Sequence, residues 1–291
     1  MVVGSSGASV NPALWALAFT LLPWPERRKA EFWASLQAGL EPSLPAPWRS
    51  DLERLERDLP RFRAEAADRG ARLWLPGDPG VARLLEPLPY PVALWVRGTL
   101  PPGGPCLAMV GSREGARPAL ERARAWAREL TAAGVAVLSG LARGVDGAAH
   151  RGALEAGATW GIMGSGLDHP YPPEHAGLMD RIVAAGGGVL TPFPVAARPE
   201  KWHFPRRNLI LAAWTQGVAL VAARYASGSL VTAKLALDQG KELWACPGAP
   251  EDLLAEGPNR LLREGAAKLC LSAQDIVEDI RFLRWGLTNA P

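Results

Sequence analysis

The chain has 291 residues, of which 48% are hydrophobic and 21% are charged, and its formal net charge is +3. This length predicts about two domains, and the composition argues against a chain that is disordered throughout. Three cysteines without a CxxC pair argue against a disulfide framework and against a zinc ribbon. The net charge is too small to indicate a nucleic-acid partner by itself, so a local basic patch has to make that case.

The N-terminal part of the chain predicts helices. Asn11-Pro12 is typical of a helix start, and a second helix is expected over residues 26–37. The 3-4-3 spacing of Leu52, Leu55, Leu59 and Phe62 predicts a third. We therefore expect a small all-helical domain over residues 1–70. The apolar residues 13–24 are too few to span a bilayer and lack the flanks of a signal peptide, so we expect a cytoplasmic protein without membrane contact.

Short apolar runs alternate with helical stretches over residues 105–270. Unbroken apolar strands joined by helices are typical of a parallel sheet with helices on both faces, which is an α/β fold. We expect the Pro- and Gly-rich residues 71–104 to be a connecting segment and residues 271–291 to be a C-terminal tail. The expected strands cover residues 106–110, 135–138, 159–163, 188–190, 217–222 and 242–246.

Glycines and small hydroxyls follow three of these predicted strands. They occur in Gly111-Ser112-Arg113, in residues 139–146 and in residues 164–168. Ligands of parallel sheets gather at the carboxyl ends of the strands, where glycine permits close approach and helix N-termini donate to anions. One such loop is more often only a tight turn. Three in series favour an anion-binding crevice.

The common enzyme signatures are missing. The sequence has no GxxxxGK[ST] and no GxSxG, and His169 stands where a dinucleotide fingerprint from Gly164 needs its third glycine. Asp146 and His150 stand four residues apart and could face a common ligand. An Asp at a helix start is more often a cap, however, and a lone His more often packs. We expect neither a metal nor a cofactor.

Residues 198–208 combine four cations and one acid with Trp202 and Phe204. Cations track a phosphate backbone and aromatic faces stack bases, which is the chemistry of single-strand binding. The alternative is that the aromatic rings anchor a loop while the charges face water. A further strand-to-helix transition holds Ser227-Gly228-Ser229, either as another anion-facing helix start or as a simple cap.

Together these strings resemble the DNA-processing protein A family (DprA, also called Smf). The matching residues are Val110–Arg113, Ser139–Asp146 with His150, Gly164–Asp168 with Tyr171-Pro172, Phe204–Asn208, Ser227–Thr232 and Pro247-Gly248. The resemblance runs from about residue 72 to residue 270. It implies an extended Rossmann-like domain that binds single-stranded DNA, forms a homodimer and helps to load the RecA recombinase in natural transformation, without catalysis. It also implies that the N-terminal helices are a sterile-alpha-motif-like domain.

The chain departs from the family pattern at four places. Leu209 replaces an arginine, Ala116 a hydroxyl residue, and Thr191-Pro192 a Ser-Glu pair. The residues after Ala267 are too few for the winged-helix domain that many members carry. We therefore expect DNA affinity to be weaker than the family suggests, or to be carried by other residues.

We interpret the chain as a non-enzymatic, sequence-independent single-stranded DNA-binding protein that acts with RecA. The expected phosphate ligands are Arg113, Arg143, Lys201, Arg206 and Arg207, and Phe204 is the expected stacking residue. The expected crevice is lined by Asn208, Gly111, Ser112, Ser139, Gly140, Gly164, Gly166, Ser227, Gly228 and Ser229. The rival interpretation is a Rossmann-like nucleotide-binding enzyme or sensor. Phosphoribohydrolases belong to that group, but their PGGxGTxxE signature is absent here.

Overall fold

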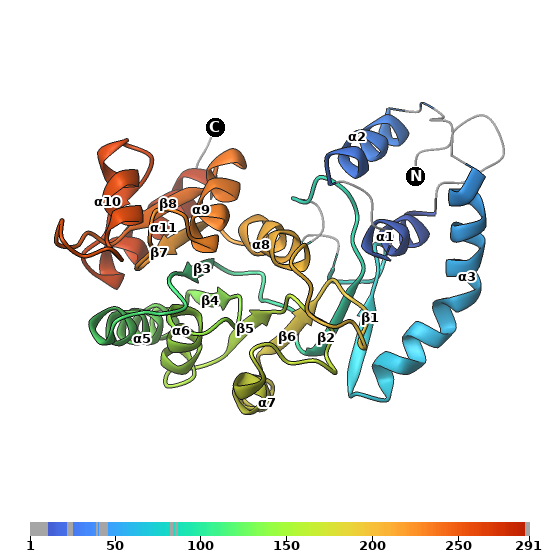
Figure 1. The fold of residues 1–291 in the computed structure, drawn as a ribbon, viewed down its shortest axis with the longest axis horizontal. Helices are drawn as coiled ribbons and strands as arrows, with labels where there is room; N and C mark the ends of the chain where they lie inside the picture. Colours follow the sequence, from blue (N-terminus) through green and yellow to red (C-terminus); the bar gives the residue numbers. More distant parts are fainter. Residues whose placement is uncertain are drawn as a thin grey trace.

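The first described part of the chain is helical. The computed structural model describes residues 11–21, 26–38, 40, 46–81, 84 and 87–288. Three helices come first: α1 (Pro12–Leu21), α2 (Glu26–Gln37) and α3 (Ala46–Ala67). They lie together at one end of the molecule (Figure 1). The Asn11 side chain accepts a hydrogen bond of 3.1 Å from the Ala13 N–H, which confirms the predicted start of the first helix.

A nine-stranded sheet runs through the molecule in the order β1-β2-β6-β5-β4-β3-β7-β8-β9. The strands β3 to β9 pair in parallel with one another, whereas β2 pairs antiparallel with both β1 and β6. The sheet is therefore mostly parallel, as the apolar runs predict. The strands are β1 (Ala71–Trp74), β2 (Leu94–Gly98), β3 (Cys106–Val110), β4 (Ala136–Ser139), β5 (Thr159–Ile162), β6 (Gly188–Thr191), β7 (Gly217–Leu220), β8 (Glu242–Ala245) and β9 (Lys268–Leu269).

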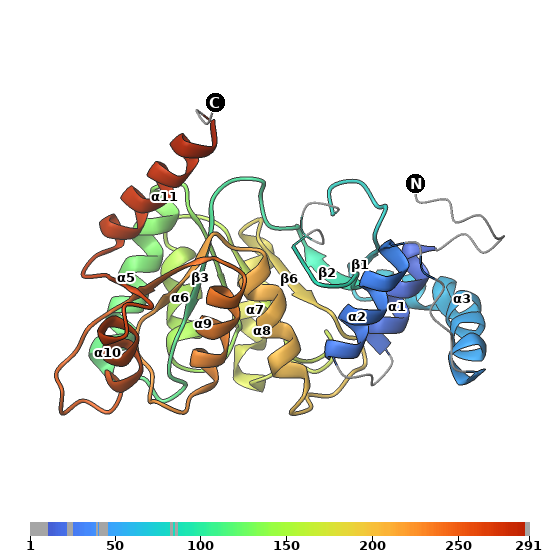
Figure 2. The same ribbon diagram turned by 90° about the horizontal axis from the view of Figure 1, so that it is seen from above.

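Helices cover both faces of this sheet (Figure 2). Trp126 of α5 and Ile276 of α11 pack with Leu107 of β3 on one face, and Ile210 of α8 packs with Ala108 on the other. The predicted α/β class with helices on both faces is confirmed. The remaining elements are α5 (Arg117–Ala132), α6 (Val145–Ala153), η1 (Pro173–His175), α7 (Ala176–Ala184), α8 (His203–Ala213), α9 (Gly228–Asp238), α10 (Glu256–Arg263) and α11 (Ala273–Thr288).

Residues 71–104 are more than a connecting segment, because they supply β1 and β2. Leu73 lies opposite Trp95, and Val96 lies opposite Leu190 of β6. All four side chains are buried, so this part of the chain belongs to the core. Buried side chains of α1 and α3 belong to the same hydrophobic cluster, which continues from the helical unit into the sheet.

The chain after residue 270 also differs from the expected tail. Residues 273–288 form α11, whose Ile276, Val277 and Ile280 are buried beside α5. Residues 289–291 lie outside the described residues. Within the described ranges, no helix has both the length and the apolar character needed to cross a bilayer.

Candidate nucleic-acid interface

The largest group of predicted site residues lines a pocket of about 420 Å³ at the carboxyl ends of β3 and β7. From β3, the chain builds β4, β5 and β6 on one side and β7, β8 and β9 on the other. Such a reversal of strand order opens a crevice where α/β proteins bind ligands. The pocket is lined by Gly111, Ser112, Arg113, Phe204, Arg207, Asn208, Ser227, Gly228 and Ser229, among others. Nine of the sixteen predicted residues therefore meet in one place.

One wall of this pocket is the N-terminus of α9. Ser227 is the N-cap residue, but its side chain makes no capping hydrogen bond. Instead, its hydroxyl and that of Ser229 are hydrogen-bonded to each other at 2.8 Å. The first amides of a helix and two hydroxyls thus face the pocket, an arrangement that suits a phosphate.

Phe204 and Arg113 meet at the pocket edge. The Arg113 guanidinium carbon lies 5.3 Å from the centre of the Phe204 ring. On another side, the ring centre of Phe204 lies 5.6 Å from that of Tyr171, which is exposed. Arg113 is exposed, and no carboxylate of the described residues forms an ion pair with it. An aromatic ring and a cation without a carboxylate partner among the described residues therefore lie in contact.

Arg207 lies beneath the pocket rather than at its rim. Its guanidinium donates to the carbonyls of Gly140 and Ile162, at the ends of β4 and β5, and to Asn208 Oδ1 at 2.9 Å. Burial lowers the pKa of Arg207 to about 10, so the side chain remains charged at neutral pH. The Asp146 carboxylate beneath the same pocket favours that charge. Arg207 thus contributes positive potential to the pocket floor and fixes two strand ends.

The expectation for Arg206 is wrong in this structure. Its side chain is only 2% exposed and donates to the carbonyls of Phe19 and Thr20 at the end of α1. Arg206 therefore holds the N-terminal helices against α8 and does not line the pocket. Adjacent residues on a helix point about 100° apart, so Arg206 faces away from the pocket that Arg207 underlies.

Two other predicted cations lie outside the pocket. Arg143 is bound by Glu174, with Tyr171 and Phe204 nearby in a small neighbouring cavity that Gly140 also lines. Lys201 is exposed just before α8, on the approach to the site. Both could therefore contact only a ligand that extends beyond the pocket.

Three predicted crevice residues serve packing. The buried Ser139 hydroxyl donates to the Met109 carbonyl at 2.6 Å. A Cβ at Gly164 would lie 2.8 Å from Phe204 Cδ1, and one at Gly166 would lie 2.1 Å from the Pro194 carbonyl oxygen. These residues make room for neighbours and present no group to the pocket.

The sequence interpretation missed several pocket residues. Arg224, Thr232 and Glu114 line the pocket, and Asp146 reaches its base. Arg224 follows β7 at the end of a predicted apolar run, so its position at a strand end was a usable signal. Asp146 is bound to the backbone: its Oδ2 accepts from the Gly140 N–H at 3.1 Å and from the Ala142 N–H at 3.3 Å.

His150 is buried and hydrogen-bonded to Thr159, as expected for a histidine that serves packing. Thr159 Oγ1 donates to the Val137 carbonyl at 2.6 Å, so His150 Nδ1 donates to Thr159 Oγ1 at 2.9 Å. Burial lowers the pKa of His150 to about 3, which keeps the ring neutral. Across the part of the chain that the structure describes, no group of three or more His, Cys, Asp or Glu side chains could hold a metal ion.

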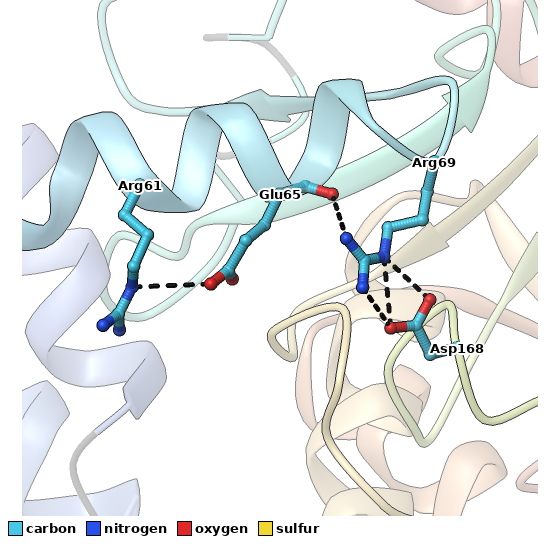
Figure 3. A network of polar contacts seen from close by, with 4 residues as sticks. All are labelled: Arg61, Glu65, Arg69 and Asp168. Atoms are coloured by element: carbon cyan, nitrogen blue, oxygen red, sulfur yellow. Dashed lines mark hydrogen bonds and ion pairs between the residues drawn. The ribbon is translucent and has the colours of Figure 1, made fainter.

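The loop after β5 is tied to the helical unit through Asp168. Its carboxylate accepts from Arg69 Nε at 2.9 Å and from Nη2 at 2.8 Å, while Arg69 Nη1 donates to the Glu65 carbonyl (Figure 3). Hydrogen bonding from Arg69 lowers the pKa of Asp168. This loop begins at Gly164, against which Phe204 packs. The end of α3 thus supports the loop that positions the stacking ring.

Comparison with known proteins shows which family has this sequence. The family model described as DNA recombination-mediator protein A matches residues 75–281. Protein Smf of Escherichia coli is 40% identical over 212 residues, which are 72% of this chain and 56% of that protein. DNA processing protein DprA of Bacillus subtilis is 37% identical over 193 residues, which are 65% of this chain and 64% of that protein. The chain belongs to the DprA/Smf family.

Solved DprA structures agree with this membership. The X-ray structure of DprA from Streptococcus pneumoniae has a TM-score of 0.72 and 28% identity, covering 91% of this chain and 90% of that one. A DprA structure from Helicobacter pylori, whose subject is a unique single-stranded DNA binding mode, has a TM-score of 0.61 and 27% identity. It covers 68% of this chain and 91% of its own. The chain thus shares the DprA fold, while it spans only 56% and 64% of the two curated relatives described above.

Proposed function

We propose that this DprA family member binds single-stranded DNA without sequence preference, in the cytoplasm, and acts in DNA recombination. The observation that carries the proposal is the pairing of Phe204 with Arg113 beside the α9 N-terminus. An aromatic face stacks any base, and the cation and helix amides bind a phosphate of the same nucleotide. No part of this arrangement reads base edges. The single-stranded DNA binding mode of the H. pylori DprA supports the same class of ligand.

The binding test compares single and double strands of equal length at two salt concentrations, by fluorescence anisotropy. We expect a preference for the single strand, because Phe204 needs an unstacked base. Equal affinity for both forms in matched salt would contradict the stacking role of Phe204.

Homodimer formation is a further part of the proposal. Two linked sites make the second engagement of a strand intramolecular, which raises avidity without new contacts. Closed twofold dimers are also the commonest oligomers. Light scattering at micromolar protein should then give twice the 31.0 kDa chain mass. A mass of one chain at every concentration would remove the dimer and the avidity argument.

The last part of the proposal is that the bound strand is passed to RecA in natural transformation. This step rests on family membership. Its test is the lag before RecA hydrolyses ATP on single-stranded DNA, which this protein should shorten. An unchanged lag, at protein concentrations that saturate the DNA, would contradict the RecA step and leave DNA binding in place.

We propose that the protein is not an enzyme. The rival phosphoribohydrolase-like activity can be tested directly. The protein is incubated with nucleoside monophosphates and any released base is measured by chromatography. Asp146 is held by two backbone amides beneath the pocket, which suits a structural carboxylate. Base release that disappears in Asp146→Asn would favour the rival activity.

A further inference from the structure

A second cavity, of about 730 Å³, lies between α2 and the α8–α9 pair. In both views α8 lies between α9 and the N-terminal helices (Figures 1 and 2). We call this cavity the interdomain groove. It is defined by Lys29, Tyr90, Trp202, Arg206, Leu209 and Leu235.

The interdomain groove adjoins the pocket at β3 and β7. Pro205 and Val231 line both cavities, so the two share a wall made of these side chains. Phe204 lines the pocket, while Trp202 lines the groove. The start of α8 and its N-cap residue Trp202 therefore supply one aromatic ring to each cavity. A ligand that leaves the pocket across Pro205 enters the groove.

The groove walls suit an aromatic ligand. Most of its surface is apolar, and Leu209 and Leu235 are among the side chains that line it. Trp202 is 43% exposed, which is high for an indole. Its Nε1 donates to Glu200 Oε2 at 2.5 Å, and its ring meets the edge of Phe193 at 5.6 Å, so its orientation is fixed. A fixed, exposed indole is a stacking surface for a base.

The groove is also cationic. Among the described residues, Arg27, Lys29 and Arg206 line it together with Glu26, and Arg27 is paired with Glu31 at 2.7 Å on the same helix. Glu26 binds Lys29 Nζ at 3.1 Å, whereas Arg206 has only neutral carbonyl partners in the described part of the chain. Arg206 is buried and forms no ion pair with a carboxylate of the described residues, while the nearby Glu26 carboxylate favours its charge. A positive potential beneath an apolar surface favours a polyanion that carries apolar rings.

We propose that the interdomain groove is a second nucleotide subsite, which binds a base of the same single strand that occupies the pocket. The inference rests on the proposed function, because the strand must first be held at Phe204. Trp202 stacks the base, and the backbone crosses the wall formed by Pro205 and Val231. The N-terminal helices, through α2, thereby form part of the DNA-binding surface.

Continuity with the pocket favours a strand over the other possible occupants. A peptide or a second copy of this chain would have to find the groove independently, whereas a strand held at Phe204 is already beside it. The excess of cations points the same way, since the partner must be anionic.

The test separates the two subsites by strand length. Oligothymidines of about 4 and about 12 nucleotides are titrated by fluorescence anisotropy, lengths within the range of known single-strand sites. Trp202→Ala should weaken binding of the longer strand about 5- to 150-fold, the loss of one base–aromatic stack, and leave the shorter strand unchanged. Trp202→Phe should restore most of the affinity. Leu271→Ala, which truncates an exposed side chain after β9, is the matched control and should change neither.

Each alternative has its own signature. Failure of the wild-type protein to bind either strand would overturn the proposed function and the subsite together. Normal binding with no effect of Trp202→Ala on the longer strand would overturn the subsite alone. Equal weakening of both strands would also overturn it, because Trp202 would then act by supporting Phe204. Loss of dimer mass in Trp202→Ala would assign the groove to a second copy and overturn the proposal.

A second measurement does not depend on the variant. A 4-thiothymidine is placed at each position of the longer strand in turn, crosslinked by light and mapped by mass spectrometry. We expect one or two neighbouring positions to crosslink to residues 26–37 or to Trp202, while others crosslink near Phe204. Absence of any crosslink to α2 or Trp202 would overturn the subsite.

Discussion

Arg207 and Asp146 hold the same residue, Gly140, from its two sides. Asp146 Oδ2 accepts from the Gly140 N–H, and Arg207 Nη1 donates to the Gly140 carbonyl. A Cβ at this position would collide with the Arg207 guanidinium, so only glycine fits between the two charges. Both charged side chains are buried, and together they fix the loop after β4 beneath the pocket. The pair therefore acts on the shape of the site.

Removing Arg207 should destabilise the fold more than it weakens any single DNA contact. Arg207→Ala leaves the Gly140 and Ile162 carbonyls without a donor and Asp146 without its positive neighbour. The expected loss is about 3 kcal/mol or more of unfolding free energy. Urea denaturation measures it. Asp146→Asn should cost less, because one amide oxygen can still accept from both backbone N–H groups.

The control for that prediction is Arg113→Ala, an exposed substitution that should change stability by no more than about 0.5 kcal/mol. If Arg207→Ala were as mild as Arg113→Ala, the buried network around Gly140 would have no structural role.

The salt dependence of DNA binding should distinguish the exposed Arg113 from the buried Arg206. Each phosphate contact on a single strand contributes roughly −0.7 to the slope of log K against log salt. Arg113→Ala should flatten the slope by about this amount. Arg206→Ala should change it much less, since that buried side chain binds carbonyls of α1 and can act on the strand only through its charge. Anisotropy titrations at four or more salt concentrations give the slopes, and an equal change in both variants would remove Arg113 as a phosphate ligand.

Phe204 should carry the stacking of one base. Phe204→Ala should weaken binding of strands of every length about 5- to 150-fold, which corresponds to roughly 1–3 kcal/mol. Phe204→Tyr keeps the ring and should stay close to the wild-type affinity. Binding of duplex DNA is the comparison, and it should fall much less. A duplex that loses as much affinity as the single strand would show that Phe204 supports the pocket instead of stacking a base.

The buried Lys29 predicts a pH dependence of stability. Burial, and then the positive charge of Arg206, lower the pKa of Lys29 from 10.5 to about 8. Between these values the unfolded chain binds the proton and the folded chain releases it, so unfolding free energy rises with pH across this window. Lys29→Met removes the effect. The stability of wild type relative to Lys29→Met should therefore increase by on the order of 3 kcal/mol from pH 8 to pH 10.5.

Thermal or urea unfolding at several pH values supplies the comparison, and the variant corrects for the groups that titrate in this range without interacting with Lys29. A constant difference between the two proteins from pH 8 to pH 10.5 would show that Lys29 keeps an ordinary pKa in the folded chain.

The parallel strands were predictable because each is a continuous apolar run that ends at glycine, serine or proline. The run at residues 106–110 matches β3, and the others differ from the structure by a residue or two at their ends. β2 was not predicted, although residues 93–96 are apolar, because its partners are β1 and β6 and the second lies some ninety residues away. Pairing over such a distance leaves no local pattern in the sequence.

Site residues could be predicted where their type implies a place at the end of a strand. They could not be predicted where the direction of the side chain decides whether it reaches the pocket. Glycine and serine after β3 and before α9 lie at the pocket, as their place at strand ends requires. Arg206 and Arg207 are chemically alike and adjacent, yet one faces α1 and the other faces the strand ends. α8 begins at His203, so both arginines lie near its start and the helical period separates their directions.

The hydrogen bonds from Arg206 to α1 join the N-terminal helices to the sheet domain. A chain that began after residue 70 would leave this guanidinium, now satisfied by the carbonyls of Phe19 and Thr20, facing water beside the uncovered rings of Tyr90 and Phe193. The next residue holds the ends of β4 and β5. A disturbance at Arg206 would therefore reach Arg207, which lies beneath the pocket, through a single peptide bond. The helical unit is part of the frame of the site and is not a detachable attachment to it.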